Sequence, residues 1–400
     1  MSLKKIIRQL HLWFGLLSGA VVFVISITGC LYAFQEEIQN ATQPFRYVTA
    51  QKAAFLPPSK LQAIATAQLP GKHLHAVMYS GPEKAAQAIF FQFDPSYYFL
   101  VYLNPYTGEV LKVKNMDEDF FRIVLDGHYY LWLPPAIGQP VVAYTTLTFL
   151  FMLMSGIVLW WPRNKAAATQ RFWFKWKEGL QWKRKNYDLH NIIGFYSSWV
   201  VIILVLTGLI WGFQWFSTSV YTLAGGTKST LFQEAVSARP KQPVTTEQAP
   251  AIDRIWTRMQ AENPAAKTME VHIPDTDTAS IAVNINTEEG TFWKIDYRYF
   301  DQYTLKELPV HHIYGRFHEA KPADKLLRMN YDIHVGAIWG LPGKIIAFCF
   351  SLMAASLPVT GFLIWLGRRR KAGKVLPVSA GRTTSATRKR PVTYPLRERT

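Results

Sequence analysis

Residues 10–35 read LHLWFGLLSGAVVFVISITGCLYAFQ, and residues 189–214 read LHNIIGFYSSWVVIILVLTGLIWGFQ. Both stretches contain a Leu-His pair at the start, a Thr-Gly pair 17 residues after the His, and a Phe-Gln pair at the end. Both are also apolar over a length sufficient to cross roughly 30 Å of hydrocarbon. The repetition predicts a duplicated chain in which two membrane helices begin near a histidine, His11 and His190.

Two further segments complete a set of four that carry no formal charge over a membrane-spanning length. Each is too long for a buried helix of a water-soluble core. The sequence therefore predicts a polytopic α-helical membrane protein with four transmembrane helices in two repeated halves. We expect residues 1–35 to be retained as an anchor, because their apolar run is too long for a cleaved signal peptide.

The net charge of +17 at neutral pH is distributed unevenly. Lys and Arg concentrate in residues 1–11, 163–188 and 368–400, all of which flank apolar segments. Basic segments beside membrane helices stay in the cytoplasm, so both termini and the middle loop are expected inside and the two long polar segments outside. Topology and attraction to membrane lipid explain the charge, and nucleic-acid binding is not expected.

Each half of the chain is expected to carry one outer lobe, made of a helix packed on an antiparallel sheet. In the first lobe a helix starting near Ser59 precedes the strands, and in the second a helix ends near Glu262. The expected strands are residues 74–79, 88–93 and 97–103 in the first lobe, and 269–273, 280–285 and 291–299 in the second.

The complete predicted organisation alternates membrane helices with polar segments. Within the middle loop, aromatic residues on one face of 171–185 predict a helix lying in the membrane interface. The expected segments are a cytoplasmic N-terminus and first membrane helix (1–35), a first lobe with an outer ligand segment (36–140), a second membrane helix (141–162), a basic cytoplasmic loop (163–189), a third membrane helix (190–217), a second lobe with an outer ligand segment (218–341), a fourth membrane helix (342–367) and a disordered basic cytoplasmic tail (368–400).

A histidine precedes each of the other two membrane segments as well. His128 and His334 lie 27 or 28 residues before the glycine of a Ser-Gly or Thr-Gly pair. By topology they belong to the outer face, whereas His11 and His190 belong to the inner face. Ionisable residues at membrane depth are costly and usually functional. Two ligands at each face predict two b-type haems, each with both axial positions filled by imidazole; a structural role at the helix ends is the alternative.

Three more histidines lie close together in the second outer segment. His311, His312 and His318 fall within a stretch that the first half lacks. Imidazoles bind metals and titrate near neutral pH, so these residues are candidates for contact with a ferric substrate. A solvent-exposed loop without such a role is the alternative reading.

Several short motifs now define a resemblance. The chain resembles the PepSY-associated transmembrane (PepSY_TM) family of bacterial inner-membrane proteins, encoded among iron-regulated uptake functions and including FoxB-type ferrisiderophore reductases. The resemblance covers roughly residues 1–371 and implies PepSY-like periplasmic lobes, two haems held by the four histidines, and reduction of ferric siderophores. Its motifs are Leu10-His11-x-x-x-Gly15, Tyr187-Asp188-Leu189-His190, Asn104-Pro105-Tyr106-Thr107-Gly108, Tyr331-Asp332-Ile333-His334, and the Ser/Thr-Gly-x-x-x-Trp ends at Gly156 and Gly361.

The second lobe departs from the turn motif, because Leu305 stands where the first lobe has Gly108. We expect that the second lobe has lost whatever this turn serves. The two cysteines, Cys30 and Cys349, both lie in membrane segments and are expected to be packing residues without a disulfide framework.

The preferred function is transmembrane electron transfer to ferric iron in a siderophore. No dinucleotide-binding motif is present, and a cytoplasmic loop of about 26 residues is too short for a flavin or nicotinamide domain. The electron donor is therefore expected to be a quinol or a cytoplasmic protein. The alternative is a non-enzymatic envelope protein whose lobes bind peptides or proteases. A permease for the chelate is a third, disfavoured possibility.

Overall fold

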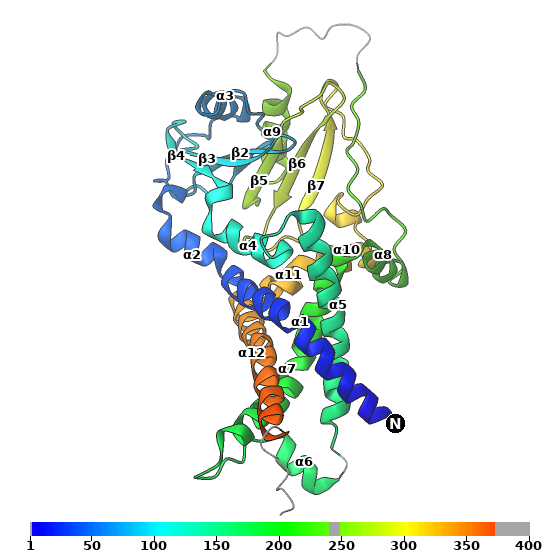
Figure 1. Ribbon diagram of the computed structural model, residues 1–400. Coiled ribbons are helices and arrows are strands. Elements are labelled where there is room, and N and C mark those ends of the chain that lie inside the picture. The colour runs from blue at the N-terminus through cyan, green and yellow to red at the C-terminus, as the bar shows by residue number, and fades with distance from the viewer. Residues whose placement is uncertain (1, 163, 240–248, 373–400) are drawn as a thin grey trace, which may run out of the picture.

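The computed structural model describes residues 2–162, 164–239 and 249–372, and this part of the chain contains four helices long and apolar enough to cross a membrane (Figure 1). Their most apolar windows have mean hydropathies of 1.9 to 2.2. The chain is therefore a polytopic helical membrane protein, as the sequence predicts. The four helices are α1 (Leu3–Ala33), α5 (Pro135–Trp160), α7 (Trp182–Gly212) and α12 (Gly340–Ala372).

The membrane helices form a closed ring in which each helix touches one helix of its own half and one of the other half. α1 contacts α5 and α12, and α7 contacts α5 and α12. A Cβ atom at Gly19 of α1 would lie 3.3 Å from the Pro358 side chain of α12, so these two backbones approach closely. Small residues commonly permit such packing within a bilayer. The buried centre of the ring contains Val22, Phe149, Leu153, Val201, Val205, Leu209 and Ala354.

The third membrane helix begins before the segment that was expected to contain it. Helix α7 starts at Trp182 and includes the basic residues 183–185, so the loop expected over residues 163–189 ends eight residues earlier. The expected interface helix over residues 171–185 is wrong. The short helix α6 (Lys165–Arg171) ends there, and residues 172–181 are not helical. Phe172 instead packs edge-on against Trp160, with ring centroids 4.8 Å apart.

The first membrane helix of each half ends at its Phe-Gln pair. α1 is followed at Gln35 by a short helix, α2 (Gln35–Thr42), and α7 is followed at Gln214 by α8 (Gln214–Leu223). In both halves the Phe-Gln pair therefore lies where the chain leaves the membrane bundle and continues towards the polar domain. The C-terminal tail was expected to be disordered over residues 368–400. Residues 368–372 instead belong to α12, and residues 373–400 lie outside the described residues.

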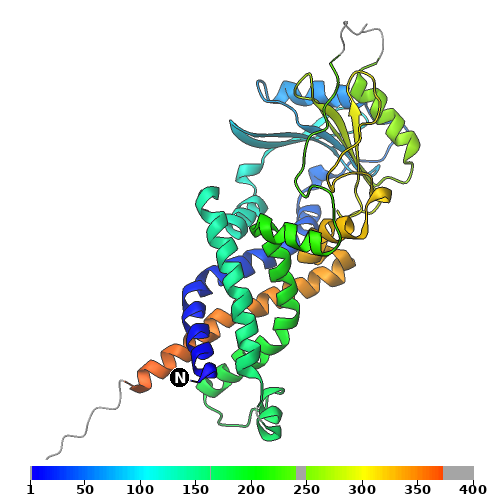
Figure 2. The ribbon, with the colours of Figure 1, turned by 90° about the vertical axis from the view of Figure 1, so that its right-hand side faces the viewer.

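Above one end of the bundle lies a polar domain, named here the head domain, built on a single antiparallel sheet of seven strands (Figure 1). The strand order is β4-β3-β2-β1-β5-β6-β7. Two helices, α3 (Pro58–Gln68) and α9 (Ala251–Glu262), lie on the face of the sheet away from the bundle (Figure 2). The strands are β1 (Ala76–Tyr79), β2 (Ala86–Phe93), β3 (Ser96–Leu103), β4 (Val110–Asn115), β5 (Thr268–His272), β6 (Ser280–Asn286) and β7 (Asp296–Asp301).

The two expected lobes share one sheet. Strand β1 of the first half pairs with β5 of the second half, with Val77 opposite Val271, and both side chains are fully buried. An edge strand left open exposes unpaired backbone groups, so joining the two edges satisfies both at once. The hydrophobic core beneath α3 and α9 is correspondingly continuous across both halves, from Leu61 to Met259.

A layer of short helices connects the head domain to the bundle (Figure 1). His128 and His334 both belong to this layer. The helices of this layer are α4 (Phe120–Tyr130), α10 (Pro322–Arg328) and α11 (Asn330–His334). Single 3₁₀ turns occur at Pro44–Arg46, Met116–Glu118, Phe317–Glu319 and Ala337–Trp339.

The turn motif is kept in the second half despite the loss of its glycine. Gly108 has φ +79°, and Leu305 adopts a similar left-handed conformation with φ +57°. Each donates its N–H over 2.9 Å to the carbonyl oxygen four residues earlier, of Asn104 and Asp301 respectively. A left-handed leucine is strained. Leu305 packs against the head-domain core. The backbone turn is therefore present in both halves, and the expectation that the second half has lost what the turn serves stays a prediction.

Candidate functional site

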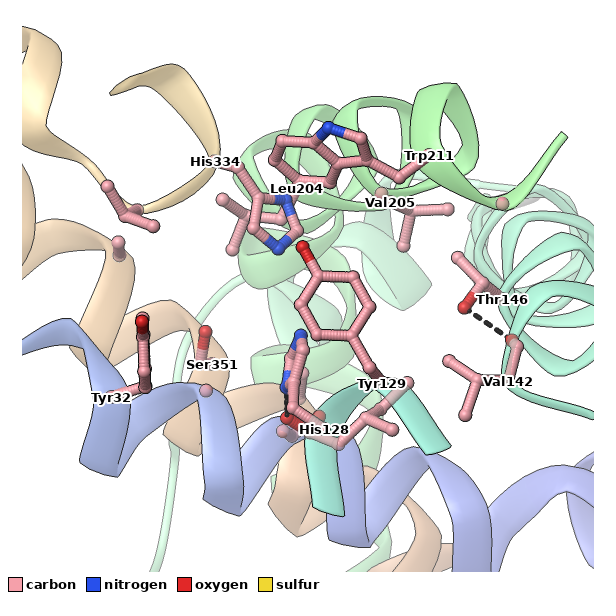
Figure 3. A pocket seen from close by; sticks show the side chains of 18 of the residues that line it. Tyr32, His128, Tyr129, Val142, Thr146, Leu204, Val205, Trp211, His334 and Ser351 are labelled. Atoms are coloured by element: carbon pink, nitrogen blue, oxygen red, sulfur yellow. Dashed lines mark hydrogen bonds between the residues drawn. The ribbon is translucent and has the colours of Figure 1, made fainter. Parts of the chain in front are cut away.

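Two histidines face each other where the connecting layer meets the bundle. His128 at the end of α4 and His334 at the end of α11, named here the head-side pair, have ring centroids 6.1 Å apart and planes inclined by 70°. Figure 3 shows both rings directed into one cavity from opposite sides. The cavity has a volume of about 160 Å³, and the Trp211 ring lies 5.2 Å from that of His334.

The other two histidines occupy the opposite end of the bundle. His11 in α1 and His190 in α7 are named here the distal pair. Each is partly buried against a neighbouring helix, His11 on α5 and His190 on α12. The structure thus places one histidine from each half at each end of the bundle.

All four imidazoles are oriented by the same kind of hydrogen bond. In every case the ring Nδ1 contacts the hydroxyl of a Ser or Thr on another helix of the same half. The Ser or Thr belongs to one of the Ser/Thr-Gly pairs that recur in the sequence. The Nδ1 to hydroxyl distances are 2.8 Å for His11 to Ser155, 3.2 Å for His128 to Thr28, 2.9 Å for His190 to Thr360 and 2.9 Å for His334 to Thr207.

The direction of these hydrogen bonds fixes the tautomer of the rings. Each Ser or Thr hydroxyl donates its own proton to a carbonyl oxygen of its helix, as Thr207 does to Ile203 over 2.9 Å. The hydroxyl oxygen is then left as an acceptor, so the imidazole must donate from Nδ1. His128 Nδ1 also contacts the carbonyl oxygen of Ile25 at 2.8 Å, which can only accept. The Nε2 atoms therefore keep their lone pairs, as a metal ligand requires.

The glycine of each Ser/Thr-Gly pair makes room for the imidazole held by its neighbour. A Cβ atom at Gly29 would lie 3.2 Å from Cε1 of His128, and one at Gly361 would lie 3.2 Å from Cε1 of His190. The corresponding distances are 3.4 Å from Gly156 to His11 and 3.5 Å from Gly208 to His334. A larger side chain at any of these positions would press on the ring edge.

The two imidazoles of each pair are suited to a metal ion whose remaining ligands come from a non-protein group. Within the described ranges, no cluster of three or more His, Cys, Asp or Glu side chains is arranged to hold a metal ion. A pair of imidazoles suffices for haem, in which the porphyrin supplies the other nitrogens. Metal–imidazole bonds of about 2 Å place two rings that share a metal on the order of 6 Å apart between centres. The separation of His128 and His334 agrees with this value.

Burial keeps the head-side imidazoles neutral. Burial lowers the pKa of His128, and burial together with the nearby His128 lowers the pKa of His334 to about 3. Neutral imidazole is the form that coordinates metals. At neutral pH both rings are therefore in the ligand form before anything binds.

An asparagine lies one helical turn before each histidine of the second half. Asn186 donates its amide N–H to the carbonyl oxygen of Thr360 over 3.0 Å, and Asn330 donates to that of Thr207 over 3.1 Å. These are the same threonines that accept from His190 and His334. Both asparagines are buried, at 4% exposure each, and both Oδ1 atoms lack a partner among the described residues. The two asparagines thus help to hold the threonines that orient His190 and His334.

The remaining candidate histidines do not join this arrangement. His311 and His318 are exposed, and His318 lies 3.6 Å from Glu319. His312 is buried, at 1% exposure, against Phe232 and Tyr299. Its Nδ1 accepts the Tyr314 N–H over 3.1 Å. His312 is therefore part of the packing of the second half, and any contact with a substrate falls to the two exposed rings.

Comparison with known proteins gives one family match. The model of the PepSY-associated TM region matches residues 8–368, which is most of the chain. The protein belongs to the PepSY-associated TM family. No curated protein matches it. The match of this PepSY-associated TM protein includes the head domain, the four paired histidines and nearly all of the four membrane helices.

Proposed function

We propose that this protein carries electrons across a bacterial inner membrane through two haems and reduces ferric iron held in periplasmic siderophores. The observation that carries the proposal is the presence of two imidazole pairs, one at each end of a single bundle. His128 with His334, and His11 with His190, would each hold one b-type haem. The two imidazoles of each pair would thus hold a group that would supply a one-electron iron centre, suited to electron transfer.

The charge distribution supports an orientation with the head domain in the periplasm. Basic residues of the first turns of α1 and α7, Lys4, Arg8 and Arg184 among them, lie at the end of the bundle opposite the head domain (Figure 1). Basic segments remain on the cytoplasmic side of a membrane. The distal pair then faces the electron source and the head-side pair faces the periplasm.

The side chains around each pair favour electron transfer without proton transfer. Each Nδ1 proton is held by a hydroxyl that is itself hydrogen-bonded to a helix carbonyl. A ring that keeps its proton throughout has a constant charge. Fixed surroundings also reduce the rearrangement that accompanies a change of charge at the metal.

The overall reaction takes one electron per ferric ion. A ferric chelate gains the electron and becomes a ferrous chelate, which oxygen-rich ligands hold less tightly because the ferrous ion is a softer cation. The electron comes from a quinol or a cytoplasmic protein. Among the described residues between α5 and α7, the short α6 is the one helix, and the segment is too short for a nucleotide-binding domain.

A visible spectrum of the purified protein tests the proposal. We expect a reducible Soret band from two low-spin haems. His128→Ala and His334→Ala should each remove the same haem, and His11→Ala and His190→Ala should each remove the other. A colourless protein from haem-replete cells would contradict the proposal. Loss of the same haem from His11→Ala and His128→Ala would contradict the pairing.

A second candidate function, binding of peptides or proteases by the head domain, has one observation in its favour. A pocket of about 150 Å³ lies where the two halves meet, lined by Phe55, Tyr79 and Trp256 among others. The indole N–H of Trp256 is buried there without a hydrogen-bond partner among the described residues. A haem-free preparation that retains peptide binding would favour this function.

A further inference from the structure

The sequence Asn-Tyr-Asp-aliphatic-His occurs twice, and its two aspartates make different contacts. In residues 186–190, Asp188 pairs with Arg184 of its own helix, with Nε and Oδ1 2.9 Å apart. In residues 330–334, Asp332 is fully buried, at 0% exposure. Its carboxylate accepts the backbone N–H groups of Phe292, over 3.0 Å, and Trp293, over 2.7 Å. Asp332 therefore joins α11 to the segment that leads into β7 of the head domain.

We propose that Asp332 is a positioning residue through which the head domain holds His334, so that the head-side site depends on the conformation of residues 291–295 and the distal site does not. The proposal rests on the proposed function, because it takes His334 to be a haem ligand. Hydrogen bonds from backbone N–H groups to a buried carboxylate are among the stronger contacts in proteins.

Helix geometry allows Asp332 to link the two layers. Residues two apart on an α-helix project in directions roughly 200° apart. Asp332 can therefore face the head domain while His334 faces the bundle, and the hydrogen-bond partners of the two residues agree with this. Asp332 contacts Phe292 and Trp293, whereas His334 contacts Thr207 of α7.

The residues just before Asp332 also contact both the head domain and the bundle. The Tyr331 ring packs edge-on against Phe292, with centroids 5.1 Å apart. Arg328 donates to the carbonyl oxygens of Ile295 and Gly315 in the second half of the head domain. On the bundle side, Asn330 donates to Thr207. Asp332 is the centre of this set, because it alone binds two successive backbone groups of the head-domain segment.

The histidine of the first half is held by a different link. Asp119 accepts the N–H groups of Phe121 and Arg122 at the start of α4, and it pairs with Lys114 of β4 at 2.6 Å. This ion pair ties β4 to the first turn of α4, nine residues before His128. The head domain therefore contacts the helices that carry both head-side histidines. Only in the second half does this contact lie close to the histidine, at Asp332.

The test uses full-length protein in detergent and compares Asp332→Asn with Asp188→Asn, the matched change in the other copy of the motif. The measurements are low-temperature electron paramagnetic resonance of the ferric haems and a potentiometric titration of the visible bands. We expect Asp332→Asn to shift one low-spin signal and one of the two midpoint potentials. Asp188→Asn should leave that signal unchanged.

A second variant guards against a folding failure. Phe292→Pro removes one of the donated N–H groups and leaves Asp332 in place, so it should shift the same signal as Asp332→Asn. Wild-type signals in both variants, with normal thermal melting, would overturn the inference while leaving the proposed function intact. Equal shifts of both haem signals would overturn it too. A wild-type protein without haem would remove both the proposed function and the inference.

Discussion

Each Ser/Thr-Gly pair performs two tasks with two adjacent residues. The hydroxyl accepts the Nδ1 proton of one imidazole, and the glycine leaves space for the edge of the same ring. Neighbouring residues of a helix project about 100° apart, so a ring lying across the helix surface meets both positions. The pair thus fixes the tautomer of a histidine on a different helix and determines how closely its ring can approach.

Replacement of one glycine should affect only the histidine that it faces. In Gly29→Val the new side chain would begin 3.2 Å from Cε1 of His128 and would displace the ring. We expect loss of most of the head-side haem with the distal haem retained. Gly361→Val should give the reverse, because Gly361 faces His190 at the same distance. Haem content and the two low-spin signals of each variant measure the effect.

Gly194→Val provides the control for these variants. Its Cβ would meet only the flexible end of the Leu357 side chain at 3.5 Å, and it faces no imidazole. This variant should keep both haems, with a loss of stability of at most about 1–3 kcal/mol. If Gly194→Val lost haem as readily as Gly29→Val, general disruption of the bundle would explain both results. The glycines that face the imidazole rings would then have no specific role.

The sequence predicts the four histidines and their pairing by face, but not the groups that orient them. The Thr-Gly and Ser-Gly pairs are visible as repeats, yet His11 and Ser155 are 144 residues apart. Nothing in the spacing indicates which hydroxyl meets which ring. Asn186 and Asn330 were missed for the same reason, although their identical position four residues before a histidine was a usable signal.

At the scale of helices and strands, the local sequence pattern predicts most elements. It fails where contacts with distant segments determine whether a strand forms or where it begins. All four membrane helices were predicted, although the third begins eight residues earlier than expected, and five of the strands were found within two residues. The strand expected over residues 291–299 begins only at Asp296, because the preceding backbone N–H groups bind Asp332 instead of a neighbouring strand. Strand β4 was missed, since its Lys112 and Lys114 give it little apolar alternation. The β1–β5 pairing joins segments far apart in sequence.

The second half of the head domain should lose stability in acid through one carboxylate. Burial raises the pKa of Glu307, but hydrogen bonds from Arg316 and Arg298 outweigh that effect and lower the pKa to about 2. The unfolded value is about 4.3. The stabilisation is therefore complete above about pH 4.3 and is lost as the pH falls from there towards 2.

Thermal melting of the head domain, followed by tryptophan fluorescence between pH 5 and pH 2.5, measures this loss. Glu307→Gln should lower stability by roughly 1–3 kcal/mol at pH 7, because Arg298 is left without one charged partner. The variant should also show a smaller decrease on acidification. Parallel pH curves for the variant and the wild type would mean that Glu307 does not account for the acid sensitivity.

At the scale of the whole molecule, the proposed orientation predicts which surfaces a membrane-impermeant thiol reagent reaches. Phe93 of the head domain is 85% exposed, and Trp173, at the opposite end of the molecule, is 69% exposed. In spheroplasts, Phe93→Cys should be labelled at once and Trp173→Cys only after permeabilisation. The opposite order would reverse the orientation and with it the direction of electron flow.

The wild-type protein serves as the control for this labelling. Its Cys30 and Cys349 both lie in membrane helices, so they should react little with a charged reagent in either preparation. Strong labelling of the wild type would require replacement of both cysteines before the experiment is repeated. Each head-domain and loop variant must also retain both haems, so that the labelled molecules are the folded ones.

The division of each imidazole pair between the two halves has a consequence for assembly. Every histidine is hydrogen-bonded within its own half, whereas its pair partner belongs to the other half. A half-length chain would therefore carry one histidine of each pair and could complete neither pair alone. Two half-length chains placed side by side would be needed to complete both.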